Sequence, residues 1–282
     1  MDIATIRGGT RLEMCSMPWS KYVATPGLNP STIIDGRTSM RHLRYAWEAA
    51  GEDTDAKLFG RAQHCLLLEP REFEQRYWPW EGRRAGNAYV EFCVRAEAEG
   101  AEVIRAEGEY SAASAIAATA GFLAHPLVQR LVKAGSAEQA LFADECGLQC
   151  KGRVDWISTS EHCLTDIKTA RNITARAFGR AFYSYGYDIK LGLYKRWLDR
   201  VTGERWPVTV ICLENKPPYD VVVVPIPEAV VEQGADRGLA IIAKVRDCID
   251  KNEWPGIASN EPYYLDVPTW EMDMEETVEF QG

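Results

Sequence analysis

The segment from about residue 137 to residue 170 constrains the fold most, because helical periodicity gives way there to short strand-like runs. Three such runs are Gln139–Phe142, Gln149–Ile157 and Cys163–Lys168. Only short turn segments, at 144–147 and 158–161, separate them. The sequence therefore predicts a sheet meander at the centre of the chain.

The remaining sequence predicts helices on both sides of this meander and further strands after it. Helical periodicity covers residues 37–69 and 86–134; further helices are expected at 174–184, 187–201 and 227–251, and strands at 208–213 and 220–224, with a bend at Pro217-Pro218. Residues 1–36 are rich in Pro, Gly and Thr and are expected to form an irregular arm. Together these elements predict an α/β fold, with a mixed central sheet flanked by helices and a helical N-terminal part.

We divide the chain into an arm with the first helix at residues 1–50, a folded domain at 51–270 and an acidic tail at 271–282. A chain of 282 residues with 46% hydrophobic residues can bury a full-sized core. No apolar run reaches the length of about 18 residues that a membrane span needs, and no secretory signal is visible. We therefore expect a cytoplasmic protein without a membrane partner.

The eight cysteines are spread along the chain without a C-x-x-C pair. A zinc or iron–sulfur site requires several thiolates at short, fixed spacing. We therefore expect free thiols that are buried or incidental.

The net charge of −9 limits how this chain could bind nucleic acid. Neutralisation of phosphates supplies most of the affinity of a nonspecific duplex binder, so such proteins usually have a basic excess. Part of the deficit comes from five acidic residues between Glu271 and Glu279. Nucleic-acid binding would require Lys and Arg to be concentrated in one groove or channel.

The hairpin around residues 158–161 places two aspartates opposite each other. If its turn is centred between Ser160 and Glu161, then Asp155 faces Asp166, with Cβ atoms ~5 Å apart. Facing carboxylates repel, so replacing either one would be expected to relieve strain in the metal-free chain. A divalent cation, such as the Mg²⁺ that one or two carboxylates and a phosphate commonly hold, would explain the pair.

Two further groups extend this pattern. Lys168 shares a strand face with Asp166, where an ammonium suits phosphodiester hydrolysis by orienting water or stabilising developing charge. Glu138 lies on the face of Asp155 if the turn at 144–147 is a two- or four-residue loop, and on the other face if the loop has three residues. Alternation of acids and bases on a solvated sheet face remains the alternative interpretation.

His64 is a candidate metal ligand on the helix predicted at 56–68. It lies one step from the apolar stripe of that helix, and Gly60 leaves room beside it. Neutral imidazole is a good metal ligand. A partly buried helix histidine without a metal is the alternative interpretation.

Several motifs in order resemble the RecE-like (exodeoxyribonuclease VIII) exonucleases of the PD-(D/E)XK superfamily. The segment 60–70, GRAQHCLLLEP, is similar to their G-R-A-x-H-x-x-x-L-E-P motif. The segments Gly152–Trp156 and Thr165–Thr169 are similar to their two core strands, and the segment 185–194 is similar to the helix that bears Q-x-x-x-Y. The resemblance covers about residues 55–270.

This resemblance implies a restriction-endonuclease-like fold and the roles of several side chains. His64, Asp155 and Asp166 would hold Mg²⁺ or Mn²⁺, and Glu138 and Lys168 would be catalytic together with the two aspartates. Tyr194 is retained, but Lys190 stands where the family has glutamine. We expect Lys190, Tyr194 and Arg153 to contact substrate, the last because its predicted place opposite Lys168 would line a channel.

The resemblance also implies an activity and partners. Such enzymes degrade one strand of linear duplex DNA from 5′ to 3′, form toroidal trimers or tetramers, and work with a single-strand annealing protein in recombination. Their genes are often carried by phages, which places the protein in a bacterial or phage-infected cell. Two alternatives remain: another PD-(D/E)XK activity on single strands or flaps, and a catalytically inactive DNA-binding protein.

Overall fold

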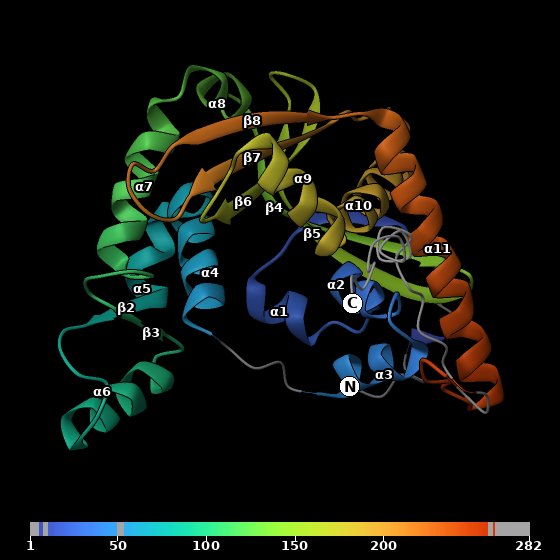
Figure 1. The fold of residues 1–282 in the computed structure, drawn as a ribbon, viewed down its shortest axis with the longest axis horizontal. Helices are drawn as coiled ribbons and strands as arrows, with labels where there is room; N and C mark the ends of the chain where they lie inside the picture. The colour runs from blue at the N-terminus through green and yellow to red at the C-terminus, as the bar shows by residue number, and fades with distance from the viewer. Residues whose placement is uncertain (1–5, 8–10, 50–53, 259–261, 263–282) are drawn as a thin grey trace, which may run out of the picture.

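A six-stranded mixed sheet forms the centre of the protein (Figure 1). The computed structural model describes residues 6–7, 11–49, 54–258 and 262. The sheet contains, in spatial order, β1 (Glu13–Ser16), β4 (Gly135–Glu145), β5 (Leu148–Ser158), β6 (Cys163–Ala170), β7 (Val208–Glu214) and β8 (Val221–Ile226). Neighbouring strands are antiparallel except β6 and β7, which are parallel.

The hairpin between β4 and β5 fixes which residues face each other at the site described below. Its loop has two residues, Cys146 and Gly147, with φ values of 54° and 72°. Positive φ at both loop positions is the geometry of a type I′ turn, which matches the twist of the flanking strands. Register pairs on either side, such as Gln139 with Val154, place Glu138 level with Asp155. The two-residue loop on which the position of Glu138 depended is confirmed.

The parallel pair of β6 and β7 requires a long crossover connection. Two helices form it, α9 (Ala175–Ser184) and α10 (Tyr187–Thr202). α10 packs on one face of the sheet together with α11 (Glu228–Lys251), which runs along one side of the molecule in Figure 1. The opposite face is covered by α7 (Ala112–Ala124) and α8 (Pro126–Leu131), whose apolar side chains contact Ile167 and Ile211.

A smaller lobe extends from the sheet on the side of α7 (Figure 1). It contains α4 (Asp55–Leu68), a 3₁₀ turn (Pro70–Glu72), α5 (Phe73–Arg76), β2 (Tyr77–Trp80), α6 (Asn87–Ala98) and β3 (Glu102–Arg105). β2 and β3 form a two-stranded parallel sheet that the sequence did not predict. Both strands have four residues, too few for an alternating pattern to stand out beside long helices.

The predicted α/β fold with a mixed sheet and flanking helices is confirmed, but the irregular N-terminal arm is wrong. Residues 13–35 contain β1, α1 (Trp19–Ala24) and α2 (Pro30–Asp35), and α3 (Met40–Glu48) follows. β1 pairs with β4 and so belongs to the main sheet. β1, α1 and α2 have four to six residues each, too few to show a strand or helix period. The Pro and Gly residues therefore dominated the sequence pattern. The predicted acidic tail at 271–282 lies outside the described residues.

α10 and α11 cross so closely that glycine is required at the contact. A Cβ atom on Gly234 would overlap the backbone carbonyl of Asp188. We expect Gly234→Ala to destabilise the protein by about 1–3 kcal/mol, the usual cost of overpacking. Gly179→Ala on α9, where a Cβ meets nothing within 4 Å, should instead be neutral or stabilising by about 0.5–1 kcal/mol. Urea unfolding of both variants measures the difference; equal stabilities would contradict the close crossing.

A candidate metal and nucleic-acid site

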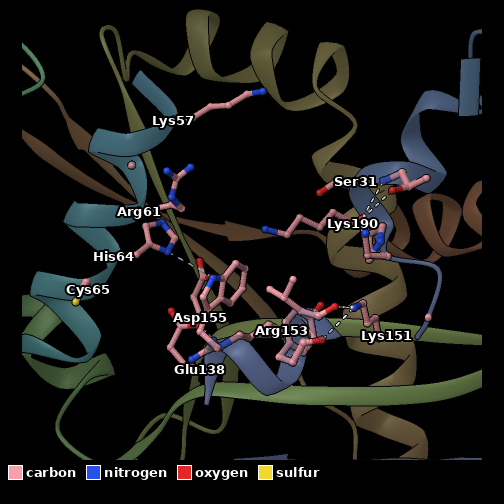
Figure 2. Close-up of a pocket in the computed structure, with 18 of the residues that line it drawn as sticks. Ser31, Lys57, Arg61, His64, Cys65, Glu138, Lys151, Arg153, Asp155 and Lys190 are labelled. Carbon is pink, nitrogen blue, oxygen red and sulfur yellow. Dashed lines mark hydrogen bonds and ion pairs between the residues drawn. The ribbon is translucent and has the colours of Figure 1, made fainter. Parts of the chain in front are cut away.

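A cavity of about 1160 Å³ opens where β5, α4 and α10 meet the N-terminal helices. Figure 2 shows His64 and Arg61 pointing into it from α4, Asp155 from β5, and Lys190 from α10. Ser31 on α2 lies across from Arg61 and His64 (Figure 2). Most of the residues singled out from the sequence therefore face one space, although four separate segments supply them.

Three possible metal-ligating side chains converge in this cavity. One ligand atom from each of His64, Glu138 and Asp155 lies within 4.8 Å of the others. Glu138 has a φ of 51°, and the Glu138–Asp155 pair is missing from the otherwise continuous β4–β5 ladder. Left-handed φ at a non-glycine residue costs free energy and persists where the surrounding structure imposes it. The distortion brings the Glu138 carboxylate beside Asp155, where two oxygen ligands and one imidazole suit a divalent cation.

His64 is held in an orientation that suits a ligand. Its Nε2 lies 3.1 Å from the carbonyl oxygen of Ile167 on β6. Its Nδ1 lies 3.7 Å from Oδ1 of Asp155. When Nε2 carries the proton and donates to the carbonyl, the lone pair of Nδ1 is directed at the carboxylates. Metal-binding histidines commonly donate their second ring N–H to a carbonyl in this way.

Asp155 and Asp166 do not form the cross-strand backbone pair expected from the sequence. The predicted register holds from Ser158↔Cys163 to Trp156↔Thr165, and the ladder ends there. Beyond that point Oδ2 of Asp155 accepts a hydrogen bond of 2.7 Å from the backbone N–H of Ile167. The side chain thus replaces a backbone partner, and the two strands separate where the site begins.

The negative charge of Asp166 is neutralised by two lysines. The expectation that Asp166 and Asp155 repel each other as a facing pair is therefore wrong. Lys168 binds Oδ2 of Asp166, and Nζ of Lys190 lies 3.2 Å from Oδ1. Burial alone would raise the pKa of Asp166, but the two ammoniums hold it below its usual range. Removing this carboxylate would leave two buried cations without their partner. Among the described residues, the cluster of three ligands that could hold a metal contains Glu138 instead of Asp166.

Glu138 is the carboxylate most affected by its surroundings. Burial, and then the neighbouring charge of Asp155, raise its pKa to about 8. Arg153 opposes this shift, with Nε at 2.6 Å from a carboxylate oxygen of Glu138. A cation bound between the two carboxylates would remove their repulsion. The donor set therefore fits a divalent metal.

The expectation that Arg153 faces Lys168 across the sheet is wrong. The β5–β6 ladder ends before this position, and Arg153 lies opposite Ala140 on the other side of β5. Its side chain is 8% exposed and is paired with Glu138 and Glu69. We therefore interpret Arg153 as a residue that positions Glu138 rather than one that binds phosphate.

Lys190 and Tyr194 lie one helical turn apart on α10, and their side chains are in contact. The ammonium of Lys190 lies 5.3 Å from the ring centroid of Tyr194, as in a cation–π contact. The ring of Tyr194 packs over Gly152 on β5, where a Cβ would overlap it. Tyr194 is only 6% exposed. Substrate contact in this pair would come mainly from Lys190, whose side chain is 19% exposed.

Lys168 lies behind the cavity wall with its ammonium between three partners. It binds Asp166, donates to the carbonyl of Ile167 at 3.2 Å and lies 5.0 Å from the ring centroid of Tyr187. Burial lowers the pKa of Lys168, although Asp166 opposes the shift. The D-x-K spacing therefore places an ammonium beside a carboxylate at the edge of the site, as the sequence predicted.

Sequence reasoning gave no role to several residues that build this site. Glu69 binds both Arg153 and Arg76, so it supports the arginine behind Glu138. Lys151 donates to three carbonyl oxygens at the end of α1 and anchors the N-terminal segment to β5. Glu69 was visible within the segment 60–70 quoted above. Lys151 gave no signal beyond sharing the alternating strand face of Asp155.

The fold and the convergent carboxylates, imidazole and lysine define the PD-(D/E)XK class of α/β domain. The chain belongs to the family described as "PDDEXK-like domain of unknown function (DUF3799)", whose sequence profile matches residues 37–264. Among curated proteins no match is found. No helix in the described ranges combines the length and hydrophobicity of a membrane span.

Solved structures support the fold. A proposed exonuclease from Eubacterium rectale superposes with a TM-score of 0.62 at 12% identity, covering 93% of this chain and 99% of its own. A phage-related exonuclease from Haemophilus somnus 129PT gives a TM-score of 0.34 at 11% identity, covering 82% of this chain and 97% of its own. A TM-score of 0.34 is too low to show a shared fold. The first likeness supports the fold alone, because the sequences have diverged so far.

Proposed function

We propose that the protein is a divalent-metal-dependent DNA exonuclease similar to the RecE-like enzymes. The observation that carries the proposal is the convergence of His64, Glu138 and Asp155 in a cavity that Lys190 also lines, with the Asp166–Lys168 pair behind its wall. A bound Mg²⁺ or Mn²⁺ would polarise a phosphate and lower the pKa of a water molecule.

The side chains of the site would then have separate roles in hydrolysis. His64, Asp155 and Glu138 would hold the cation, and Asp166, which is paired with Lys168 and Lys190, would lie beside them. Lys168 orients the attacking water or stabilises the negative charge that develops on the phosphate. Lys190 contacts a phosphate oxygen, since it is the cation that reaches the cavity from α10. Arg153 holds Glu138 in place.

The substrate and partners follow from the resemblance rather than from the geometry. We propose degradation of one strand of linear duplex DNA from 5′ to 3′, which leaves a 3′ single strand for recombination by annealing. A toroidal trimer or tetramer would keep the duplex captive, and a single-strand annealing protein would take the product. Because a ring would prevent the duplex from dissociating, a chain of net charge −9 would need less electrostatic attraction to stay bound to DNA.

Digestion of linear duplex DNA tests this function. Duplexes labelled at the 5′ or the 3′ end are incubated with and without Mg²⁺, beside closed circular duplex. We expect metal-dependent loss of linear duplex, early release of the 5′ label and intact circles. Excess unlabelled competitor added after loading should not stop digestion if the protein encircles DNA. Absence of cleavage under all metal conditions would refute the nuclease. Cleavage of circles would indicate an endonuclease, and an immediate stop by a protein that sediments as a monomer would refute the ring.

A further inference from the structure

α9 and the turn that follows it bear a strip of basic and aromatic side chains, Arg176, Arg180, Tyr183 and Tyr185, which we call the α9 strip. From residue 168 to residue 190 the chain has five Lys and Arg residues and a single carboxylate, Asp188. That carboxylate is buried and accepts a hydrogen bond of 2.6 Å from Arg237. This segment is therefore locally positive, although the protein as a whole has a net charge of −9.

The α9 strip is on the outer face of its helix. Phe178 and Phe182 point inward and join the main core. Tyr183 is 51% exposed and Tyr185 is 64% exposed. Both arginines are exposed as well, and neither makes an ion pair within the part of the chain that the structure describes. Their charges are therefore available to an external anion.

The exposed tyrosines are held by a rigid turn. Arg37 donates hydrogen bonds of 2.6 Å to the carbonyls of Tyr183 and Ser184. Gly186, with a φ of 68°, packs so closely on α2 that a Cβ would lie 2.8 Å from Ile34. A surface that is ordered before binding loses less conformational entropy when a ligand docks.

The α9 strip is continuous with the candidate site through neighbouring aromatic rings. The ring centroids of Tyr185 and Tyr187 are 5.7 Å apart. The ring of Tyr187 in turn covers the ammonium of Lys168 at 5.0 Å. A single ring, that of Tyr187, therefore separates Tyr185 of the α9 strip from the lysine beside Asp166.

We infer that the α9 strip binds an unpaired DNA strand next to the cleavage site. Bases would stack on Tyr183 and Tyr185, and phosphates would meet Arg176 and Arg180. Aromatic platforms beside basic side chains bind single strands without sequence preference, because every base has a stacking face. A paired base cannot offer that face to a protein side chain without unstacking. The identification of the strand as the DNA being processed rests on the nuclease function proposed above.

A second copy of this chain related by two-fold symmetry is a poorer occupant of the strip. In a two-fold contact the same patch meets itself, so Arg176 and Arg180 would face like charges. The described part of α9 offers no carboxylate to compensate them. A polynucleotide supplies the missing negative charge along its whole length.

Binding of a fluorescein-labelled thymidine oligonucleotide, measured by anisotropy in EDTA, tests the inference without any cleavage. We expect Tyr185→Ala to weaken binding roughly tenfold and Tyr185→Phe to keep it, since stacking needs the ring and not the hydroxyl. The double variant Arg176→Gln with Arg180→Gln should reduce the slope of log K against log salt by about 1.4, because each phosphate contact contributes about 0.7 on single strands. Tyr45→Ala, at another exposed tyrosine (74%) on α3, is the matched control.

The outcomes separate this inference from the proposed function. Unchanged binding by Tyr185→Ala, or an equal loss in Tyr45→Ala, overturns the α9 strip even if the native protein digests DNA. Loss of an oligomer in sedimentation, with single-strand affinity retained, also overturns it and makes the strip an interface between copies. Native binding with the expected losses, but without metal-dependent cleavage, supports the strip and refutes only the nuclease.

Discussion

Asp155→Asn is expected to abolish DNA cleavage while leaving the fold intact. The asparagine oxygen can still accept the hydrogen bond from the Ile167 N–H that Asp155 accepts at 2.7 Å, so the strand separation at the site is preserved. The negative charge beside His64 and Glu138 is lost. Residues that only orient a metal ligand typically change affinity or activity about 10–100-fold, and a direct ligand should cost more. Initial rates of digestion at saturating Mg²⁺ measure the loss.

Asp166→Ala should lose activity to a similar extent but, unlike Asp155→Asn, should also destabilise the protein. It leaves the partly buried ammoniums of Lys168 and Lys190 without their shared carboxylate, which is itself 1% exposed. Breaking a buried ion pair costs about 3 kcal/mol or more, which lowers the Tm of a chain of this size by roughly 5–10 °C. Asp250→Asn, at an exposed ion pair on α11, is the control for loss of one carboxylate. If Asp166→Ala melts at or above the native temperature, the two-lysine arrangement is wrong.

The sheet and its main helices could be predicted because each element is long enough to show its period. β5, which has 11 residues, and α10, which has 16, were placed within two residues of their observed ends. The hairpin arithmetic that placed Asp155 level with Asp166 also reproduced the observed register at the turn end of β5 and β6. Strand period and turn position are local properties, so a single sequence contains them.

The N-terminal segment could not be predicted because its short elements depend on tertiary contacts. β1 has four residues and exists as a strand because β4 offers it a free edge. The end of α1 is fixed by Lys151 from β5, more than a hundred residues away. A Pro- and Gly-rich composition describes such a segment equally well as an arm or as an edge strand with short helices.

The sequence singled out residues that lie around the cavity, but it expected Asp166 rather than Glu138 among the metal ligands, and it did not predict how these residues pair. His64, Glu138 and Asp155 come together, although helix periodicity could not show on which side of the sheet α4 would lie. The pairing failed where the β5–β6 ladder stops, because there the side chain of Asp155 replaces a backbone partner. From that point the β5–β6 register no longer predicts neighbours, so Arg153 does not face Lys168. Arg153 instead meets Glu138 on β4, and Lys190 from α10 meets Asp166.

Lys168→Met is expected to lower kcat by about 100-fold or more with little change in metal or DNA affinity. The ammonium is proposed to act on charge that develops during hydrolysis, and groups of that kind typically contribute 10²–10³-fold. The fold should tolerate the change, because Lys190 remains beside Asp166 and the methionine stem can still pack on Tyr187. Single-turnover rates at saturating enzyme and Mg²⁺ report the chemical step.

Lys190→Gln provides the matched comparison, since it removes the other ammonium from the same carboxylate. Lys190 approaches Oδ1 of Asp166 from the cavity, whereas Lys168 binds Oδ2 from behind the wall. We therefore expect Lys190→Gln to weaken DNA binding and to reach half-maximal rate at a lower Mg²⁺ concentration, because a competing cation has gone. Lys168→Met should shift neither. If Lys168→Met instead turns over normally at saturating Mg²⁺ but requires more of the metal, Lys168 holds Asp166 in place and has no part in the chemical step.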